Sequence, residues 1–395
     1  MLDKIFHNLT NPDDFNNWFL KKTENIEMPI YASVDVRYSG WKVSVVDANS
    51  FPAGFNNISK GLVPMLSKSL NEYFKKINLK VNHVHIYPES HTRNTAYIEN
   101  ISRIKEIVEK AGYNVTVGSP ELNRYNLLEG LTEDVVLDTV VVNDEDQIEI
   151  NGEIPDLVLL NNDLTGGEIP GLSGIVIPRK EMGWHNRRKS DHYRTLGNLV
   201  DDVSEILNID PWLLMPMWFV SEDKCLELDA CINKLSNDID KMIEKIKLKY
   251  EQYGVDSEPV VFIKNDRGTY GLGIISIKSG NEIRNLSKRM IKRLTYGKGG
   301  TSAENFLIQE GIPTTLKNNI SVIEPVGYTI GGIESNWFFR SNSKKSKFEN
   351  LNSPSSVFLQ VEELGEGVIN LERMYWLDLV SKLSYLAMGL ESIQK

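Results

Sequence analysis

The sequence has 395 residues, of which 25% are charged and 41% hydrophobic, so it has the length of two or three domains and the composition of a soluble globular protein. Its 44 basic and 54 acidic residues give a formal net charge of −10, which argues against nucleic acid or an anionic membrane as the main partner. The longest apolar run, residues 212–220, is interrupted by Pro216 and is far shorter than the roughly 20 residues of a membrane helix. The N-terminus lacks the apolar segment of a secretion signal, and we therefore expect a cytoplasmic protein.

The first half of the chain alternates between short β-like runs and helical runs. This alternation favours a parallel or mixed sheet covered by helices. The predicted strands span residues 30–36, 42–46, 83–87, 114–117, 136–142, 157–160 and 174–177. The predicted helices span residues 60–76, 95–111 and 191–207.

The second half begins with a long predicted helix, 223–250, and then changes character. Strands predominate after it, which favours an α+β arrangement with an antiparallel sheet. The predicted strands span residues 260–264, 274–278, 306–309, 321–330 and 337–340, and the predicted helices span 281–294 and 371–388.

The two cysteines, Cys225 and Cys231, fall on one apolar stripe of the long predicted helix. Leu228 and Ile232 share that stripe, because positions spaced by three and four residues face one side of a helix. Cysteine in such a seam behaves as a small hydrophobic residue. We therefore expect both cysteines to be reduced core residues, not a disulfide or a catalytic nucleophile.

The segment most suggestive of nucleotide chemistry follows the strand over residues 260–264. The strand ends in Lys264, and Gly268, Gly271 and Gly273 then form a glycine-rich loop before a second strand. Glycines let backbone N–H groups approach phosphate oxygens closely, and a lysine adds a point charge for them. The loop lacks the Gly-Lys-Ser/Thr and the helix of a Walker A motif, and a plain glycine-rich hairpin is the alternative.

Three further polar groups follow in the second half. The apolar strand 306–309 leads into Gln309 and Glu310, which suits the floor of an adenine pocket. Arg340 and Asn342 stand two residues apart, as do Asn350 and Asn352, so each pair lies on one face of an extended segment. Side-chain oxygens from adjacent strands are what Mg²⁺ bridged to phosphates requires.

In this order of elements the chain resembles the ATP-grasp superfamily, and residues 350–354 (NLNSP) are similar to the Glu-x-Asn-Thr-x-Pro-Gly motif of D-alanine–D-alanine ligases. The resemblance implies that Lys264 contacts phosphate, Glu310 lies near adenine or ribose, and Arg340 steadies the transferred phosphoryl group. It places Mg²⁺ at Asn342, Asn350 and Asn352. Asparagines stand where carboxylates are usual, so Glu324 or Glu349 is needed to supply negative charge.

The resemblance also completes the predicted architecture. It implies an α/β protein with an N-terminal α/β substrate-binding domain over residues 1–210, a helical connector over 211–256 and a C-terminal ATP-grasp α+β unit over 257–395.

Polar clusters in the N-terminal half fall at the ends of predicted strands, where open α/β sheets bind ligands. Several of these segments are similar to the proteobacterial glutamate–cysteine ligase family of ATP-grasp type. The matching segments are VDVRYSGWKVSVVDANSFPAGFNN, PESHTRN, LLNNDLTGG, GWHNRRKSDHY and IKNDRGTYGLGI, within residues 29–356. This resemblance implies ligation of L-glutamate and L-cysteine to γ-glutamylcysteine through a γ-glutamyl phosphate, with ATP and Mg²⁺, as the first step of glutathione biosynthesis.

Such a reaction requires no enzyme nucleophile, because it proceeds by positioning and by stabilisation of the transferring phosphoryl group. Arg187 and Arg188 are candidate catalytic residues, with Arg93 and Arg179 as partners for a carboxylate or an acyl phosphate. The substrate ammonium is expected at Asp35, Asp47, Glu89 or Asp163. The remaining candidate substrate contacts are Arg37, Asn49 and Asn162.

Several simpler interpretations of these residues stay open. The basic run 186–194 also suits a solvated turn with Ser190 as a helix N-cap. Asp35 and Arg37 share a strand face and could pair with each other. His83 and His85 share a face too, but no second motif supports zinc. At the level of function, the alternatives are another ATP-grasp amino-acid or peptide ligase and a catalytically inactive ATP-binding sensor; a homo-oligomer is compatible with either.

Overall fold

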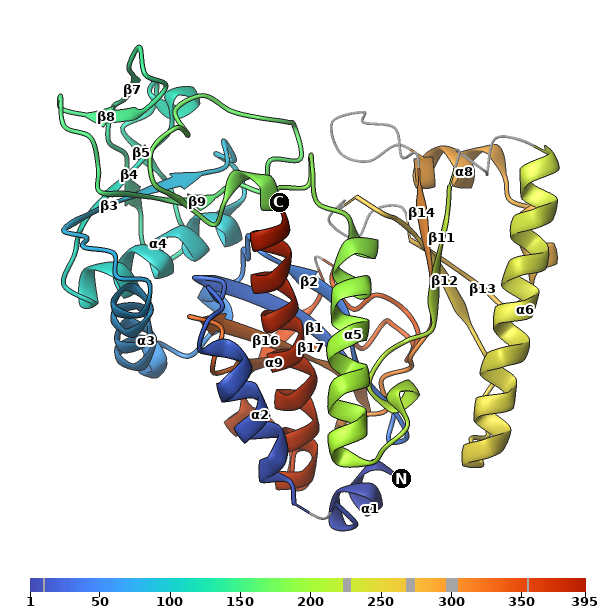
Figure 1. Cartoon of the computed structure of the whole chain (residues 1–395). Coiled ribbons are helices and arrows are strands. Elements are labelled where there is room, and N and C mark those ends of the chain that lie inside the picture. Colours follow the sequence, from blue (N-terminus) through green and yellow to red (C-terminus); the bar gives the residue numbers. More distant parts are fainter. Residues whose placement is uncertain (10, 223–228, 268–273, 296–304, 354) are drawn as a thin grey trace.

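The computed structural model describes all residues except 10, 223–228, 268–273, 296–304 and 354. Three larger sheets surrounded by helices make up the described chain, together with two small two-stranded sheets (Figure 1). The small sheets pair β5 (Leu127–Leu128) with β6 (Val135–Val136), and β7 (Val140–Val142) with β8 (Ile148–Ile150). The expected mixed α/β fold is confirmed at this level.

The central sheet is antiparallel and joins strands from both ends of the chain. Its order is β18–β17–β16–β1–β2, with β15 added beside β16. The strands are β1 (Tyr31–Tyr38), β2 (Val43–Asn49), β15 (Lys317–Asn318), β16 (Ser321–Ile330), β17 (Asn336–Ser341) and β18 (Val357–Leu359). Within it, Ser33 pairs with Tyr328 and Asp35 with Val326. The sheet therefore crosses both boundaries of the predicted three-part division.

Helices cover one face of the central sheet (Figure 1). The C-terminal helix α9 (Leu371–Gln394) packs beside α5 (Lys189–Leu207), and α2 (Asp13–Thr23) and α1 (Leu2–His7) close the layer. Alternate residues of β1, including Val34 and Val36, join Leu383 and Leu386 of α9 in one buried core. Because side chains alternate across a strand, the intervening residues of β1 point to the opposite face.

The second sheet is parallel and lies in the N-terminal half. It has the order β10–β9–β3–β4, formed by β3 (His83–Pro88), β4 (Asn114–Val117), β9 (Leu157–Asn161) and β10 (Val176–Ile177). The helices α3 (Val63–Lys76) and α4 (Thr95–Lys110) pack on each other, and their apolar residues share a core with β3 and β9.

The third sheet is antiparallel with the order β11–β14–β12–β13. Its strands are β11 (Trp218–Ser221), β12 (Val261–Asn265), β13 (Ile275–Ile277) and β14 (Phe306–Glu310). The long helix α6 (Asp229–Tyr253) packs on it through Ile239 and Ile246, which share a core with Ile263 and Ile308. The short helices α7 (Gly280–Arg284) and α8 (Lys288–Thr295) follow β13.

Most predicted elements are confirmed, three expectations are contradicted, and a fourth lies partly outside the described residues. Residues 136–142 are not one strand, because the backbone N–H of Asp138 donates to the carbonyl of Val117 and separates β6 from β7. Residues 281–294 form two helices, α7 and α8, instead of one. The long helix is described from Asp229, so the expected residues 223–228 lie outside the described chain. Cys231 packs against the core as expected but is disulfide-bonded, which contradicts the reduced state; Cys225 lies outside the described residues.

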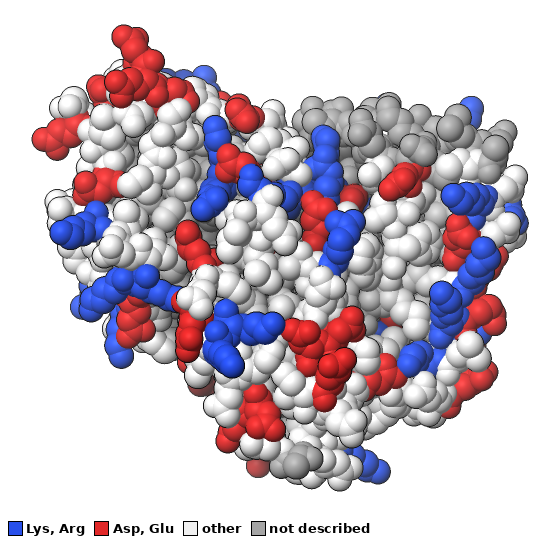
Figure 2. Space-filling model, in the orientation of Figure 1, with Lys and Arg blue, Asp and Glu red and all other residues white. Residues whose placement is uncertain are grey.

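No described helix is both long and apolar enough to cross a bilayer. On the face shown in Figure 2, basic and acidic side chains are interspersed, and acidic ones gather near the small sheet of β7 and β8.

The start of α9 offers a direct test of local stability. Asn370 is its N-cap, and the side-chain oxygen accepts a hydrogen bond from the backbone N–H of Arg373 at 2.9 Å. Replacing Asn370 with alanine should lower the free energy of unfolding by about 1 kcal/mol, because the N–H loses its acceptor. Denaturant unfolding measures the loss. Asn370→Asp is the matched control and should remain close to wild type.

Candidate functional site

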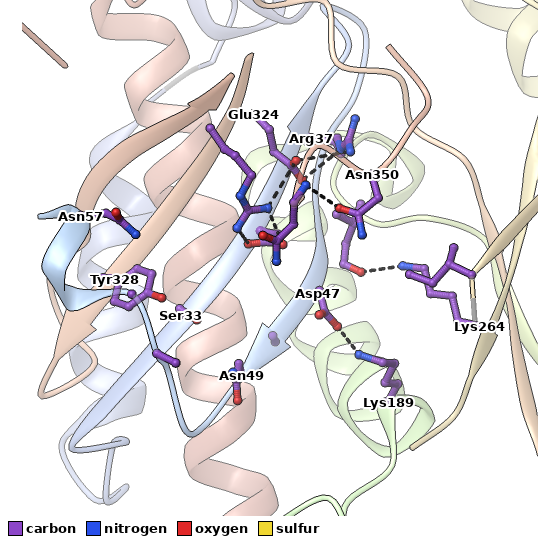
Figure 3. A pocket seen from close by; sticks show the side chains of 18 of the residues that line it. Ser33, Arg37, Asp47, Asn49, Asn57, Lys189, Lys264, Glu324, Tyr328 and Asn350 are labelled. Carbon is purple, nitrogen blue, oxygen red and sulfur yellow. Dashed lines mark hydrogen bonds and ion pairs between the residues drawn. The ribbon is translucent and has the colours of Figure 1, made fainter. Parts of the chain in front are cut away.

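A cavity of about 430 Å³ lies where the three sheets meet. The central sheet supplies one wall, the start of α5 and the third sheet supply another, and the loop after β2 with the start of α4 completes it. Twelve of the predicted site residues line it: Asp35, Arg37, Asp47, Asn49, Asp163, Lys264, Gln309, Glu310, Glu324, Arg340, Asn350 and Asn352. The fold thus brings together side chains that are far apart in the sequence (Figure 3).

Strand alternation explains how the central sheet carries a charged face. Ser33, Asp35 and Arg37 are every second residue of β1 and line the cavity, whereas Val34 and Val36 enter the core beneath α9. The same alternation brings Glu324 and Tyr328 of β16, and Phe338 and Arg340 of β17, to the cavity. One face of the sheet therefore holds the hydrophobic core and the other holds the site.

Four of these residues form a buried charge cluster. Arg37 Nε lies 3.2 Å from Glu324 Oε1, and Arg340 Nη1 lies 3.2 Å from Asp35 Oδ2 and 3.6 Å from Glu324 Oε2. Burial raises the pKa of Glu324 above its usual value, although Arg37 and Arg340 oppose the shift. The alternative in which Asp35 pairs with Arg37 is not observed, because Asp35 pairs with Arg340 and Arg37 with Glu324.

Arg340 retains hydrogen-bonding capacity for a ligand. Its Nε atom is buried and has no acceptor among the described residues. An unsatisfied buried N–H on a cation is costly, so an anionic ligand in the cavity would relieve it. The cluster thus holds Arg340 in place by two carboxylates and leaves one donor for an anion.

Two lysines meet at Asp47, opposite the charge cluster. Lys189 Nζ at the start of α5 forms an ion pair with Asp47 Oδ1, and Lys264 Nζ donates to the carbonyl of Val46 at 2.9 Å (Figure 3). Burial raises the pKa of Asp47, but Lys189 and Lys264 outweigh it, and the net shift is downward. Burial lowers the pKa of Lys264 to about 8. A second lysine, Lys189, therefore lies beside the predicted Lys264.

The strand β14 reaches the cavity through Gln309 and Glu310, next to the apolar side chains of Phe262 and Ile312. The carboxylate of Glu310 is already engaged: Oε2 accepts from Lys42 Nζ at 2.5 Å, from Trp212 Nε1 at 3.2 Å and from the backbone N–H of Met217 at 2.9 Å. Glu310 thus anchors the strand through its side chain, and its backbone N–H also donates to the carbonyl of Met217 at 2.8 Å.

The parallel sheet contributes less than predicted. Asp163 lines the cavity, and its Oδ1 accepts from the backbone N–H of Thr165 at 3.0 Å. Glu89 pairs with His91, which lines the cavity in its place. Asn162 Oδ1 accepts from the backbone N–H of Leu164 and does not line the cavity.

The four predicted anion-binding arginines all lie away from the cavity wall. Arg93 and Arg179 are exposed. Arg188 donates to the carbonyls of Asn186 and Arg187. Arg187 is 1% exposed, because its guanidinium is buried against Glu391, with Nε 2.8 Å from Oε2 and Nη2 3.3 Å from Oε1. Its Nη1 also donates to the carbonyl of Ala48 at 2.8 Å. In this structure Arg187 therefore holds β2 against α9 and does not line the cavity.

The predicted metal residues are only partly assembled. Asn342 is withdrawn, with Nδ2 donating to Ser353 and Ser355 and Oδ1 accepting from the backbone N–H of Lys344. Asn350 and Asn352 line the cavity with Glu324. No cluster of three or more His, Cys, Asp or Glu suited to a metal occurs among the described residues. The site fits an ion held by one or two carboxylates and by a ligand's own oxygens, as is usual for Mg²⁺.

Gly268, Gly271 and Gly273 lie outside the described residues, so the predicted phosphate loop stays a prediction. Sequence reasoning missed Lys189, Ser33 and Tyr328. Period-two alternation pointed to Ser33, which precedes Asp35 on the same face of β1, and to Tyr328, which follows Glu324 on β16. No sequence signal separates Lys189 from the neighbouring Arg187 and Arg188.

A charged cavity, with two lysines opposite an arginine–carboxylate cluster, has the chemistry expected of a protein that binds anionic small molecules. The family model of the glutamate–cysteine ligases, GshA, matches residues 7–392, and the chain belongs to this family. A solved structure from Methylobacillus flagellatus KT, assigned provisionally as a gamma-glutamylcysteine synthetase, is 31% identical, with a TM-score of 0.89 over 100% of this chain and 96% of that chain.

The D-alanyl-alanine synthetase A of Vibrio cholerae O1 biovar eltor str. N16961 gives a TM-score of 0.33 and 12% identity, over 75% of this chain and 79% of that chain. A comparison with curated proteins finds no match.

Proposed function

We propose that this protein uses ATP to couple L-glutamate to L-cysteine, forming γ-glutamylcysteine in the first step of glutathione biosynthesis. The observation that carries the proposal is the cavity, in which Lys189 and Lys264 face the cluster of Arg37, Glu324, Arg340 and Asp35. Membership in the glutamate–cysteine ligase family supports the choice of substrates.

The nucleotide is proposed to lie along the third sheet, in an ATP-grasp arrangement. Phe262 and Ile312 offer apolar surface for the adenine ring, and the Glu310 carboxylate fixes the adjoining strand by its three hydrogen bonds. Lys264 and Lys189 then lie where the phosphate groups of ATP would extend from the adenine pocket. Bound phosphates would compete with Asp47 for both lysines, which would release that carboxylate toward the cavity.

Phosphoryl transfer needs charge stabilisation more than covalent help from the enzyme. The γ-carboxylate of glutamate would attack the terminal phosphate of ATP, releasing ADP, and the amine of cysteine would displace phosphate from the γ-glutamyl phosphate. The buried Nε of Arg340 is placed to donate to the transferring group. Glu324, Asp35, Asn350 and Asn352 are the described residues that would hold Mg²⁺, which would neutralise phosphate charge.

Release of ADP from Mg·ATP tests the reaction, with L-glutamate alone, L-cysteine alone and both together. Release that requires both amino acids, with a γ-linked dipeptide as product, is expected. Release with a different pair of amino acids would change the substrates of the ligase. Tight ATP binding without release under any pair would instead identify a nucleotide sensor.

The lowered pKa of Lys264 predicts a pH-dependent affinity for ATP. Because burial lowers that pKa to about 8, the ligand-free lysine is mostly protonated at pH 7 and mostly neutral at pH 9. The dissociation constant for ATP should therefore rise about tenfold between these pH values. Titration calorimetry at both pH values measures it.

Lys264→Met supplies the control for this prediction. Burial also lowers the pKa of Lys42 to about 8, but the Nζ atom of Lys42 is engaged in an ion pair with Glu310. The variant should bind ATP weakly with little dependence on pH. An unchanged tenfold dependence in Lys264→Met would assign the effect to another group.

A further inference from the structure

The end of the cavity away from the two lysines is aromatic. Tyr328 of β16, Phe338 of β17 and Phe358 of β18 line it, and we call these three residues the aromatic wall. Their rings form a continuous row, with centroids 5.4 Å apart for Tyr328 and Phe338 and 5.7 Å apart for Phe338 and Phe358. Tyr328 and Ser33 lie on the opposite side of the site from Lys264 (Figure 3).

The loop after β2 closes over this wall and is built to fit it closely. A Cβ added to Gly54 would lie 2.5 Å from the hydroxyl oxygen of Tyr328, so only glycine permits the observed approach. The carbonyl of Asn57 accepts a hydrogen bond from Gln360 Nε2 at 2.6 Å, which ties the loop to the segment that follows β18. The backbone N–H of Phe55 donates to Asn100 Oδ1 at 2.9 Å, which fixes the loop to α4.

One polar atom in this loop lacks a partner. Asn56 lines the cavity, and its Oδ1 is buried with no donor among the described residues, while its Nδ2 donates to Asn57 Oδ1 at 3.4 Å. A buried acceptor without a donor is unfavourable, so an N–H group of a ligand would stabilise this arrangement. The aromatic end thus offers apolar surface and an acceptor, whereas the lysine end offers charged donors for anions.

Building on the proposed function, we propose that the aromatic wall and Asn56 form the subsite for the amine substrate, and that they select an L-amino acid with a small apolar or thiol side chain. The amine would donate to Asn56 Oδ1, and the side chain would lie against Phe358 and Tyr328. Sulfur and methyl groups pack favourably on aromatic rings. A carboxylate side chain would lose its hydration against these rings, which favours binding of the acidic substrate beside the arginines and lysines.

Substitution of Phe358 separates the two substrates. Phe358 is partly exposed at the end of the sheet, so Phe358→Ala is expected to fold. The KM for L-cysteine should rise about tenfold, as expected for a lost apolar contact in a pocket, while the KM values for ATP and L-glutamate stay within about twofold. The preference for L-cysteine over L-serine should fall as well. Val357→Ala, on the same strand but outside the cavity lining, is the matched control and should leave all three KM values unchanged.

A rescue experiment tests the same subsite from the other side. Gly54→Ala should raise the KM for L-cysteine by crowding the Tyr328 hydroxyl, and adding Tyr328→Phe should restore much of the affinity, because it removes the nearest atom. The KM for L-glutamate should stay within about twofold in both variants, which separates a local effect on the amine subsite from a general loss of structure. A rise in the KM for L-glutamate with that for L-cysteine unchanged would overturn the proposal, as would an unchanged KM for both in active Phe358→Ala. Absence of ADP release by the wild-type protein would instead reject the proposed function.

Discussion

Lys264→Ala is expected to lower kcat by about 10²–10³-fold, the largest effect on turnover of any single substitution considered for this cavity. The loss has this size because a preorganised, buried charge contact to a transferring group is worth about that much in rate. Lys264 is 8% exposed, its Nζ is held by the carbonyl of Val46, and Asp47 lies beside it. ADP release under saturating substrates, with product analysis, measures the change.

The matched control is Lys278→Ala, at the end of the same sheet and exposed to solvent. It should retain full turnover. Circular dichroism and unfolding curves establish that Lys264→Ala is folded. Wild-type kcat in a folded Lys264→Ala protein would remove this lysine from the phosphate site and leave Lys189 as the candidate.

Glu391→Ala is expected to reduce the free energy of unfolding by about 3–5 kcal/mol, because it leaves the buried guanidinium of Arg187 without its counter-charge. Glu391 is 1% exposed and bridges Arg187 to His192, whose Nδ1 lies 2.5 Å from Oε1. His192 Nε2 is also 3.0 Å from Ser384 Oγ, so the network is enclosed between α5 and α9. Denaturant unfolding at neutral pH measures the loss, and exposed Glu362→Ala should remain within about 0.5 kcal/mol of wild type.

The same carboxylate predicts acid sensitivity. Burial raises the pKa of Glu391, but Arg187 and His192 outweigh it and hold the pKa at about 2, below the ordinary 4.5. A carboxylate with a depressed folded-state pKa stabilises the protein above its unfolded-state pKa and loses that stabilisation as pH falls through the folded-state value. As the pH falls from 4.5 to 2, loss of this stabilisation by Glu391 should lower the free energy of unfolding by roughly 3 kcal/mol. Glu391→Ala should lack that component, and an acid-unfolding profile identical to wild type would contradict the assignment.

Local sequence patterns predict individual helices and strands well, because the spacing of apolar residues marks the one face of each element that is buried. The bounds of β16, for example, match the predicted strand over residues 321–330. What could not be predicted was pairing between distant strands: nothing local to β1 indicates that Asp35 lies opposite Val326. The predicted division at residues 210 and 256 follows the order of elements along the chain and the family resemblance, whereas the central sheet pairs strands from both sides of it.

The site shows the same limit at the level of side chains. The sequence identifies Asp35, Arg37 and Lys264 because they are charged residues at the ends of predicted strands, and they line the cavity. Arg187 looked equally suited to an anion, but its partner Glu391 is 204 positions away and neutralises it within the core. A charge in a sequence can bind a ligand or a counter-ion, and only the tertiary arrangement distinguishes the two.

The sheet that carries Asp35 and Arg340 also constrains how the chain acquires its native state. These two residues are 305 positions apart, and β1 has β2 as its only neighbour in the described sheet until β16 is synthesised. During translation the edge of β1 that pairs with β16 therefore stays unpaired until most of the polypeptide has been synthesised. Closing so long a loop is slow, since the entropic cost precedes the contacts that offset it. The cavity is consequently among the last parts of the molecule to form, and ligands that bind there should act on nearly complete chains.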